Sequence, residues 1–335
     1  MAPFNKAVKV VPVIDEASAG PTKTYEGVAD KTWIIGSVMN GGYALALILQ
    51  ACIQFQSKTN HVDPIHITAH FLRATLASPF KVRVRLLKRG ESLTNLTAEL
   101  LQNDTVKIMA HAIFGLNEPL PQDKLRLTLE PPSTYARRHP LYDHPSKATI
   151  KPMRSTWAFH TEVQWTREAE IEAKNRPDHP NRTNSKTVGG GGLEWGAWLM
   201  LTDKEERITN PSLMFFVDMF QNTPSLLPKS EKPGLGVSWF PTVTLAVEFK
   251  HKIPPPSSIH ADRTVGIYSS GRFLNNPQGR HDVYVEVWTA PSNIGEGEPT
   301  ENWRDNQYCL ATATQMALTL PMEVNQRKGK PKANL

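Results

Sequence analysis

The chain has 335 residues, of which 39% are hydrophobic and 21% charged, as is typical of a globular protein with one large or two ordinary domains. Its net charge is +6, but outside residues 81–89 and the C-terminal tail the basic residues are scattered, which argues against a nucleic-acid-binding protein. Cys52 and Cys309 lie in apolar runs, without the spacing of a disulfide framework or a zinc site. The opening MAPFNKAVKVVPV lacks a signal-peptide core, and no apolar run reaches the ~18 residues of a membrane span, so we expect neither.

The hydrophobic pattern of residues 1–116 predicts a first repeat with a single helix between strands. Strand-like runs at 6–13 and 24–37 come first. Asn40 and the glycine pair after it then precede a predicted helix, in which Leu45, Ile48, Leu49, Cys52 and Ile53 repeat at helical spacing. Four further strand-like runs follow the helix, at residues 63–75, 78–90, 92–104 and 105–115. Residues 117–150, rich in Pro, Asp and Arg, then predict a linker or crossover.

Residues 151–322 repeat this order of elements. Strand-like runs at 157–166 and 189–202 precede a helix that we expect to begin with Asn210 as N-cap and Pro211 as its first residue. The runs after it are PTVTLAVEFKHKIP, TVGIYSSGRF, HDVYVEVWTAP and YCLATATQMALTL. Residues 323–335 form a basic tail that we expect to be disordered.

The helix predicted to start at Asn210 is apolar on nearly every side as far as Phe220, which is typical of a buried helix. Asp218 is the one charge predicted inside it, and a buried carboxylate needs hydrogen-bond donors or resists ionisation. In the strand after it, alternation places Val243, Leu245, Val247 and Phe249 on one face, and Thr242, Thr244, Ala246 and Glu248 on the other.

Phe71 and Phe249 occupy similar places in the first strand after each predicted helix, and they are 178 residues apart, about half the chain. The two halves share the pattern of elements with little residue identity. This predicts an α+β fold made twice, in which a single helix lies across a curved antiparallel sheet.

The order of these pieces resembles the acyl-CoA thioesterase II type and the thioesterase-like group of double hotdog proteins. The pieces are Asn40-Gly41-Gly42-Tyr43, HITAHFLRAT and the turn at residues 88–90 in the first half, then FFVDMF, PTVTLAVEF and ATATQMAL in the second. They cover roughly residues 30–115 and 190–320. Relative to this family, residues 165–190 and 291–306 look like insertions, and if either lies over the site, the choice of substrate would differ from that of the family. The resemblance implies a double hotdog fold of two tandem repeats and a thioester hydrolase without cofactor or metal.

The resemblance also implies a catalytic set of Asp218, Thr242 and Gln315, although Thr244 lies only two residues from Thr242 on the same predicted face. Asp218 would activate a water molecule, which the hydroxyl of Thr242 and the amide of Gln315 would hold. Backbone N–H groups at the start of the first helix, at Gly41, Gly42 and Tyr43, are candidates to bind the thioester oxygen. Each residue also has a structural reading, because Thr is common in strands and glycine permits close packing.

The expected substrate is an acyl-CoA or acyl-carrier thioester, and the expected products are the free acid and the thiol carrier. The rival hypothesis is a hotdog protein that binds an acyl or polyketide ligand, or assists biosynthesis, without hydrolysis. A homo-oligomer is compatible with exposed sheet edges. The final Lys-Ala-Asn-Leu resembles a variant peroxisomal signal, so we expect a peroxisomal or cytoplasmic location.

Overall fold

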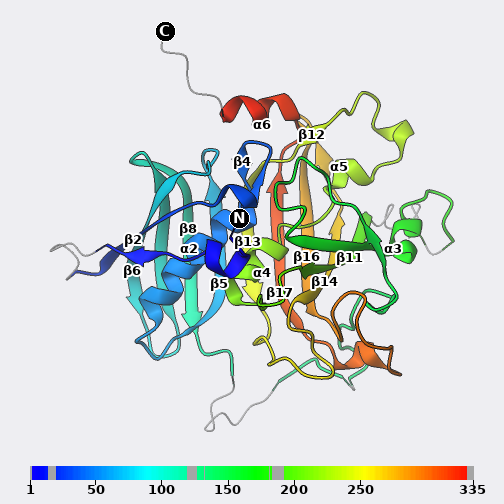
Figure 1. Ribbon diagram of the computed structural model, residues 1–335, viewed down its shortest axis with the longest axis horizontal. Coiled ribbons are helices and arrows are strands. Elements are labelled where there is room, and N and C mark those ends of the chain that lie inside the picture. The colour runs from blue at the N-terminus through cyan, green and yellow to red at the C-terminus, as the bar shows by residue number, and fades with distance from the viewer. Residues whose placement is uncertain are drawn as a thin grey trace.

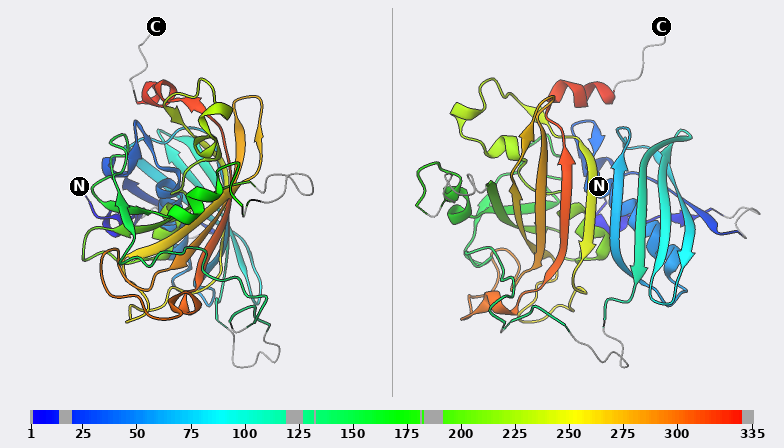
Figure 2. Two further views of the ribbon diagram at one scale, coloured as in Figure 1. Left: turned by 90° about the vertical axis from the view of Figure 1, so that its right-hand side faces the viewer. Right: turned by 180° about the vertical axis from the view of Figure 1, so that it is seen from behind.

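The computed structural model describes residues 2–13, 20–118, 127–131, 133–180, 182 and 192–329. Its centre is one antiparallel sheet of 14 strands, and the two central helices, α2 (Gly41–Gln56) and α4 (Asn210–Phe216), lie on the same side of it (Figure 1). Seen from behind, the strands of the two halves run side by side without a break (Figure 2). In the described part of the chain, no helix has the length and hydropathy needed to span a bilayer.

The first repeat contributes one edge of the sheet, with the strand order β2-β6-β7-β8-β5 from the edge to the centre. The five strands are β2 (Thr22–Val28), β5 (Asp63–Phe71), β6 (Pro79–Arg89), β7 (Thr94–Gln102) and β8 (Thr105–Gly115). Short elements precede α2: α1 (Phe4–Ala7), β1 (Val11–Pro12), η2 (Lys31–Trp33), β3 (Ile34–Ile35) and β4 (Val38–Met39).

The second repeat has the order β13-β17-β16-β14-β11-β10 from the centre outward. These strands are β10 (Val163–Arg167), β11 (Leu193–Leu201), β13 (Thr242–Phe249), β14 (Thr264–Gly271), β16 (Arg280–Thr289) and β17 (Cys309–Ala317). The smaller elements are β9 (Thr149–Lys151), α3 (Ala169–Lys174), α5 (Thr223–Leu226), η3 (Lys229–Glu231), β12 (Ser238–Trp239), β15 (Leu274–Asn275), η4 (Trp303–Asn306), β18 (Leu320–Pro321) and α6 (Met322–Lys328).

The two repeats meet where β5 pairs with β13. Ile67 lies opposite Val247, Ala69 lies opposite Leu245, and the pair between them is Thr68 and Ala246. These last two residues are 178 positions apart, the separation expected from the sequence, so they mark the centre about which the two halves are related. The prediction of a duplicated helix-on-sheet fold is confirmed.

Helix α2 begins where the sequence predicts it. The Oδ1 atom of Asn40 accepts a hydrogen bond from the Tyr43 N–H at 2.9 Å, which satisfies one of the free N–H groups of the first turn. Most side chains of the helix are fully buried, so burial of its apolar surface holds it against the sheet.

Helix α4 differs from the prediction in two ways. Its N-cap is Thr209, whose hydroxyl bonds the Ser212 N–H, so Asn210 is already inside the helix. The helix also ends at Phe216, and Asp218 lies in the turn that follows, although the apolar run continues to Phe220. The last turn of the helix packs closely against the start of α2, since a Cβ atom at Gly42 would lie 2.2 Å from the Met214 carbonyl oxygen.

The described part of the predicted crossover covers the outer face of the second repeat. Arg137 pairs with Glu286 of β16 at 3.1 Å, and the indole of Trp198 in β11 donates to the Asp143 carbonyl at 2.9 Å. The predicted insertion at 291–306 lies on this same outer face, where Trp303 packs against Trp198. It therefore does not cover the cavity described below. Of the other predicted insertion, residues 165–167 instead belong to β10, and 181 and 183–190 lie outside the described residues.

The expected disorder of the tail is wrong for residues 323–328, which form most of α6. Asn325 is fully buried in this helix, where its Oδ1 accepts from the Ser37 N–H at 2.8 Å and its Nδ2 donates to the Ile35 carbonyl at 3.0 Å. The C-terminal helix is thus hydrogen-bonded through Asn325 to the β3–β4 turn of the first repeat. The final Lys-Ala-Asn-Leu lies outside the described residues.

Candidate active site

The carboxylate of Asp218 lies at the boundary between the two repeats. Its Oδ2 atom accepts a hydrogen bond from the backbone N–H of Gly42 at 2.8 Å, at the N-terminus of α2. The N-terminus of a helix favours negative charge, and a 16-residue helix such as α2 offers a full set of aligned peptide dipoles. The second repeat therefore supplies the acid, and the first repeat supplies the group that holds it.

A β-bulge brings Thr242 to the carboxylate. In the pairing of β13 with β17, Thr242 lies opposite Ala317 and Thr244 lies opposite Met316, so Val243 is an extra residue. Thr242 consequently shares the inner face with Leu245 and its side chain reaches Asp218, whereas Thr244 is turned outward. The prediction that both threonines share a face, opposite Leu245, is wrong, because alternation cannot anticipate the bulge.

Gln315 completes a chain of three side chains. Its Nε2 donates to the Thr242 hydroxyl at 2.6 Å, and that hydroxyl lies 3.4 Å from Asp218 Oδ1, to which it donates. Gln315 is 5% exposed and shares a face of β17 with the small residues Ala311, Ala313 and Ala317. Its Oε1 atom is buried without a hydrogen-bond partner in the described structure. The three residues predicted from the resemblance therefore lie together.

Burial raises the pKa of Asp218 from 3.8 to about 6. Hydrogen bonds from the Gly42 N–H, the Gln315 amide, the Thr242 hydroxyl and the Gly41 N–H each lower it, and burial outweighs them. The carboxylate is therefore mostly ionised at pH 7, and its pKa lies only about one unit below that pH. These are the properties of an effective general base.

The three predicted oxyanion residues have different surroundings. The Gly42 N–H is bonded to Asp218 and the Tyr43 N–H to Asn40, so neither is free for a substrate oxygen. The Tyr43 hydroxyl donates to the Ala7 carbonyl and accepts from the Asp30 N–H inside the core. In this structure the backbone N–H groups of Gly42 and Tyr43 thus hold protein groups in place, and an oxyanion role for these two residues stays a prediction. Gly41 lines the cavity, and its role stays a prediction.

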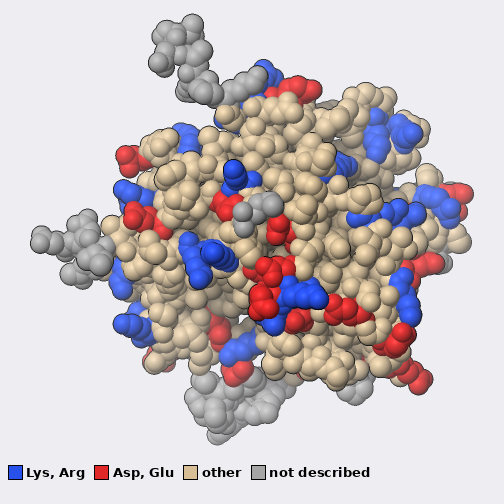
Figure 3. Space-filling model, viewed as in Figure 1, with Lys and Arg blue, Asp and Glu red and all other residues tan. Residues whose placement is uncertain are grey.

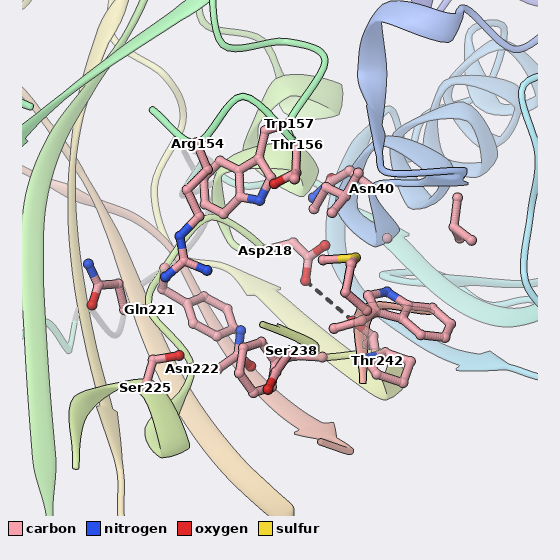
Figure 4. A pocket seen from close by; sticks show the side chains of 18 of the residues that line it. Asn40, Arg154, Thr156, Trp157, Asp218, Gln221, Asn222, Ser225, Ser238 and Thr242 are labelled. Atoms are coloured by element: carbon pink, nitrogen blue, oxygen red, sulfur yellow. Dashed lines mark hydrogen bonds between the residues drawn. The ribbon is translucent and has the colours of Figure 1, made fainter. Parts of the chain in front are cut away.

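A cavity of about 690 Å³ opens beside the three residues. Figure 4 shows Asp218 in its wall, with Thr242 on one side and Gln221, Asn222 and Ser225 on the other. Much of the lining is aromatic or apolar, and both repeats contribute to it: Ile35, Val38, Met39, Phe71, Trp157, Trp165, Met219, Phe220, Leu235, Val237, Trp239, Phe240, Pro241 and Met322. Such a lining suits an acyl chain, and the few polar groups can orient a reacting carbonyl.

Sequence reasoning missed two basic residues of this cavity, Arg154 and Lys232. Arg154 lies between β9 and the turn at Trp157, and Lys232 follows the short helix η3. Neither belongs to a periodic pattern or a motif. Only the tertiary structure shows that these segments face one opening.

Sequence profiles of one family match both halves of the chain. The profile of the acyl-CoA thioesterase N-terminal domain matches residues 29–115, and that of the C-terminal domain matches residues 144–292. Together these two domains span more than half of the chain. A search of curated proteins found no match.

Solved structures share the fold at low sequence identity. A hot dog fold protein of unknown function from Alicyclobacillus acidocaldarius is 15% identical with a TM-score of 0.64, covering 95% of this chain and 97% of its own. The acyl-CoA thioesterase II TesB2 of Mycobacterium marinum is 13% identical with a TM-score of 0.58, covering 95% and 98%. The tesB protein of Mycobacterium avium subs paratuberculosis is also 13% identical, with a TM-score of 0.56 and coverage of 95% and 98%. The chain therefore belongs to the acyl-CoA thioesterase family, as a double hotdog thioester hydrolase.

Proposed function

We propose that the protein hydrolyses acyl-CoA by direct attack of a water molecule that Asp218 activates. The observation that carries this proposal is the position of the Asp218 carboxylate, which lies in the cavity wall, held by Gly42 and Thr242, with a pKa of about 6. A base with this pKa is ionised at neutral pH and still accepts a proton readily.

Thr242 and Gln315 position the water. Because Gln315 Nε2 and the Thr242 hydroxyl are both engaged, the buried Gln315 Oε1 is the group left to accept a hydrogen bond from the water. Asp218 takes the water proton as the oxygen attacks the thioester carbon. The tetrahedral intermediate then expels the thiolate and leaves the acyl group as the free acid. Asp218 gives the proton that it took from the water to the sulfur, which yields CoA and restores the carboxylate.

The test is thiol release from a panel of acyl-CoA substrates by the wild type and by Asp218→Asn. The asparagine keeps the shape of the side chain and an oxygen for the Gly42 N–H but has no basic carboxylate. We expect kcat to fall by about 10²- to 10⁴-fold, the usual contribution of a positioned general base. Thermal unfolding of the variant at or above the wild-type Tm would exclude misfolding as the cause.

Two outcomes would contradict the proposal. If Asp218→Asn kept the wild-type kcat, another group would be the base. If the wild type bound acyl-CoA without releasing thiol above background, the protein would be a non-hydrolytic acyl-binding protein.

A further inference from the structure

The cavity has a basic side that the catalytic residues do not use. In Figure 4 the Arg154 side chain projects into the cavity on the side of Gln221, Asn222 and Ser225, away from Thr242. Lys232 belongs to the same side, because its Nζ donates to the Ser225 carbonyl at 2.6 Å. These two cations come from segments 78 residues apart, and the fold brings them to one opening.

In the described part of the chain, no protein anion pairs with these two cations. Within the described residues, the Arg154 guanidinium has no hydrogen-bond or ion-pair partner, and Lys232 has no carboxylate partner. Several other arginines are paired with carboxylates, among them Arg83 with Glu99, Arg138 with Asp305 and Arg263 with Glu296. Asp218 is the only carboxylate among the described residues that line the cavity, and backbone and side-chain donors already hold it.

The two cations are also close enough to repel each other. The pKa of Lys232 is lowered first by burial and then by the positive charges of Lys229 and Arg154. Elsewhere basic and acidic residues are intermingled, as on the face of the molecule in Figure 3. A cluster of uncompensated positive charge at the opening of a cavity favours an anionic ligand.

We infer that Arg154 and Lys232 bind phosphate groups of the pantetheine carrier of the thioester substrate. This inference rests on the proposed function, which places the thioester at Asp218. In CoA the phosphates are separated from the sulfur by the flexible pantetheine arm, so a thioester at Asp218 and phosphates at the opening suit one molecule. Arginine binds phosphate oxygens in a bidentate manner and lysine acts as a point charge.

The first experiment compares kinetics with acyl-CoA and with the S-acyl-N-acetylcysteamine of the same acyl chain, which has the thioester but no phosphate. For Arg154→Ala and for the Arg154→Ala/Lys232→Ala double variant we expect a KM for acyl-CoA raised about tenfold or more, with kcat little changed. The ratio of kcat/KM for acyl-CoA to that for the N-acetylcysteamine thioester should fall accordingly. Added salt should raise the wild-type KM for acyl-CoA more than that of the double variant.

The matched control is Arg85→Ala. Arg85 is an exposed arginine of β6, near the opposite edge of the sheet from β9, so its removal lowers the net charge by one, as Arg154→Ala does, without touching the cavity. The wild-type ratio should persist in this variant. The phosphate assignment would be overturned if kcat/KM of the double variant fell by the same factor for both thioesters. It would also be overturned if Arg85→Ala raised the KM for acyl-CoA as much as Arg154→Ala does.

Further substrates identify the source of the phosphate. Acyl-dephospho-CoA lacks the 3′-phosphate, acyl-4′-phosphopantetheine keeps one phosphate, and an acyl-carrier protein presents it as a phosphodiester. If the rise in KM caused by Arg154→Ala becomes smaller stepwise along this series, Arg154 binds phosphates that only CoA carries. If the rise is equal for all three substrates, Arg154 binds the 4′-phosphate that they share. An effect that appeared only with acyl chains ending in a carboxylate would overturn the inference, because the cations would then bind the acyl group.

Binding of CoA itself separates this inference from the proposed function. Calorimetric titration of CoA into the wild type and the double variant needs no hydrolysis. Weaker binding by the double variant supports the inference even if no acyl-CoA is hydrolysed. Equal affinity for CoA in both proteins would refute it even if hydrolysis by Asp218 is demonstrated.

Discussion

Gln315 donates its side-chain amide hydrogen to the Thr242 hydroxyl over 2.6 Å, and this bond sets the direction of the hydroxyl proton. With one lone pair of Oγ1 occupied by the amide, the hydroxyl proton points to Asp218 Oδ1, which is 3.4 Å away. The carboxylate therefore receives a donor from each repeat, the Gly42 N–H from one side and Thr242 from the other.

The first prediction tests the hydroxyl of Thr242. Thr242→Val keeps the shape of the side chain but removes the acceptor of Gln315 and a donor to Asp218, so we expect kcat to fall by about 10- to 100-fold, the worth of a lost hydrogen bond to a charged group. The pKa of Asp218 should rise further, since the Thr242 hydrogen bond lowers it. Thr242→Ser should recover most of the activity.

Thr244→Val is the matched control, because the bulge turns Thr244 to the outer face of the sheet. Its kinetics should equal those of the wild type. A larger loss in Thr244→Val than in Thr242→Val would mean that the catalytic hydroxyl is the other one.

The second prediction concerns pH. If Asp218 is the base, as proposed, its pKa of about 6 means that kcat/KM should fall tenfold per pH unit below pH 6 and be constant above pH 7. The residual activity of Asp218→Asn should lack this inflection. The pH dependence of kcat/KM is measured from initial rates between pH 4.5 and 8.5, at pH values where circular dichroism shows the fold intact. An inflection retained in Asp218→Asn would assign the titration to another group.

The same shift predicts a change in stability. The pKa of Asp218 in the folded protein is above its ordinary value of 3.8, so folding favours the protonated acid. This contribution is complete below pH 4 and is lost as the pH rises through 6. Asp218→Asn, which is neutral throughout, should therefore have a higher Tm than the wild type at pH 8 and an equal one at pH 4. An equal difference at both pH values would show that ionisation of Asp218 does not cost stability.

The fourth prediction separates two adjacent glycines. A methyl group at Gly42 would lie 2.2 Å from the Met214 carbonyl oxygen and 2.8 Å from Phe215 Cα, both backbone atoms, so Gly42→Ala should lower the free energy of unfolding by about 3 kcal/mol or more. A methyl group at Gly41 would meet the Asp218 Oδ2 at 3.0 Å and the Thr242 hydroxyl at 3.3 Å. Gly41→Ala should therefore fold near the wild-type Tm but lose activity. The reverse order in denaturant and kinetic measurements would contradict this division.

The fifth prediction concerns the C-terminal helix. Asn325→Ala removes both hydrogen bonds to the β3–β4 turn, and it leaves the Ser37 N–H and the Ile35 carbonyl without their partner. We expect a loss of about 1–3 kcal/mol in stability and a higher KM, because Ile35 and Met39 beside this turn line the cavity. Gln326→Ala, on the exposed side of the same helix, should change neither. Wild-type KM in Asn325→Ala would show that the turn keeps its position without the helix.

The amino-acid sequence by itself determined the duplicated fold and the presence of a helix after Asn40, since hydrophobic periodicity is a local property. The family resemblance named Asp218, Thr242 and Gln315 as the expected catalytic set, with Thr244 as an alternative to Thr242. The tertiary structure alone decided which threonine faces Asp218, because a one-residue bulge in β13 depends on pairing with β17 and reverses the face that alternation predicts. It also placed Asp218 beyond the end of α4 against a helix of the other repeat, and it brought Arg154 and Lys232 to one opening. These are contacts between residues far apart in the chain, and the periodicity of a sequence reports only the direction of each side chain within its own element.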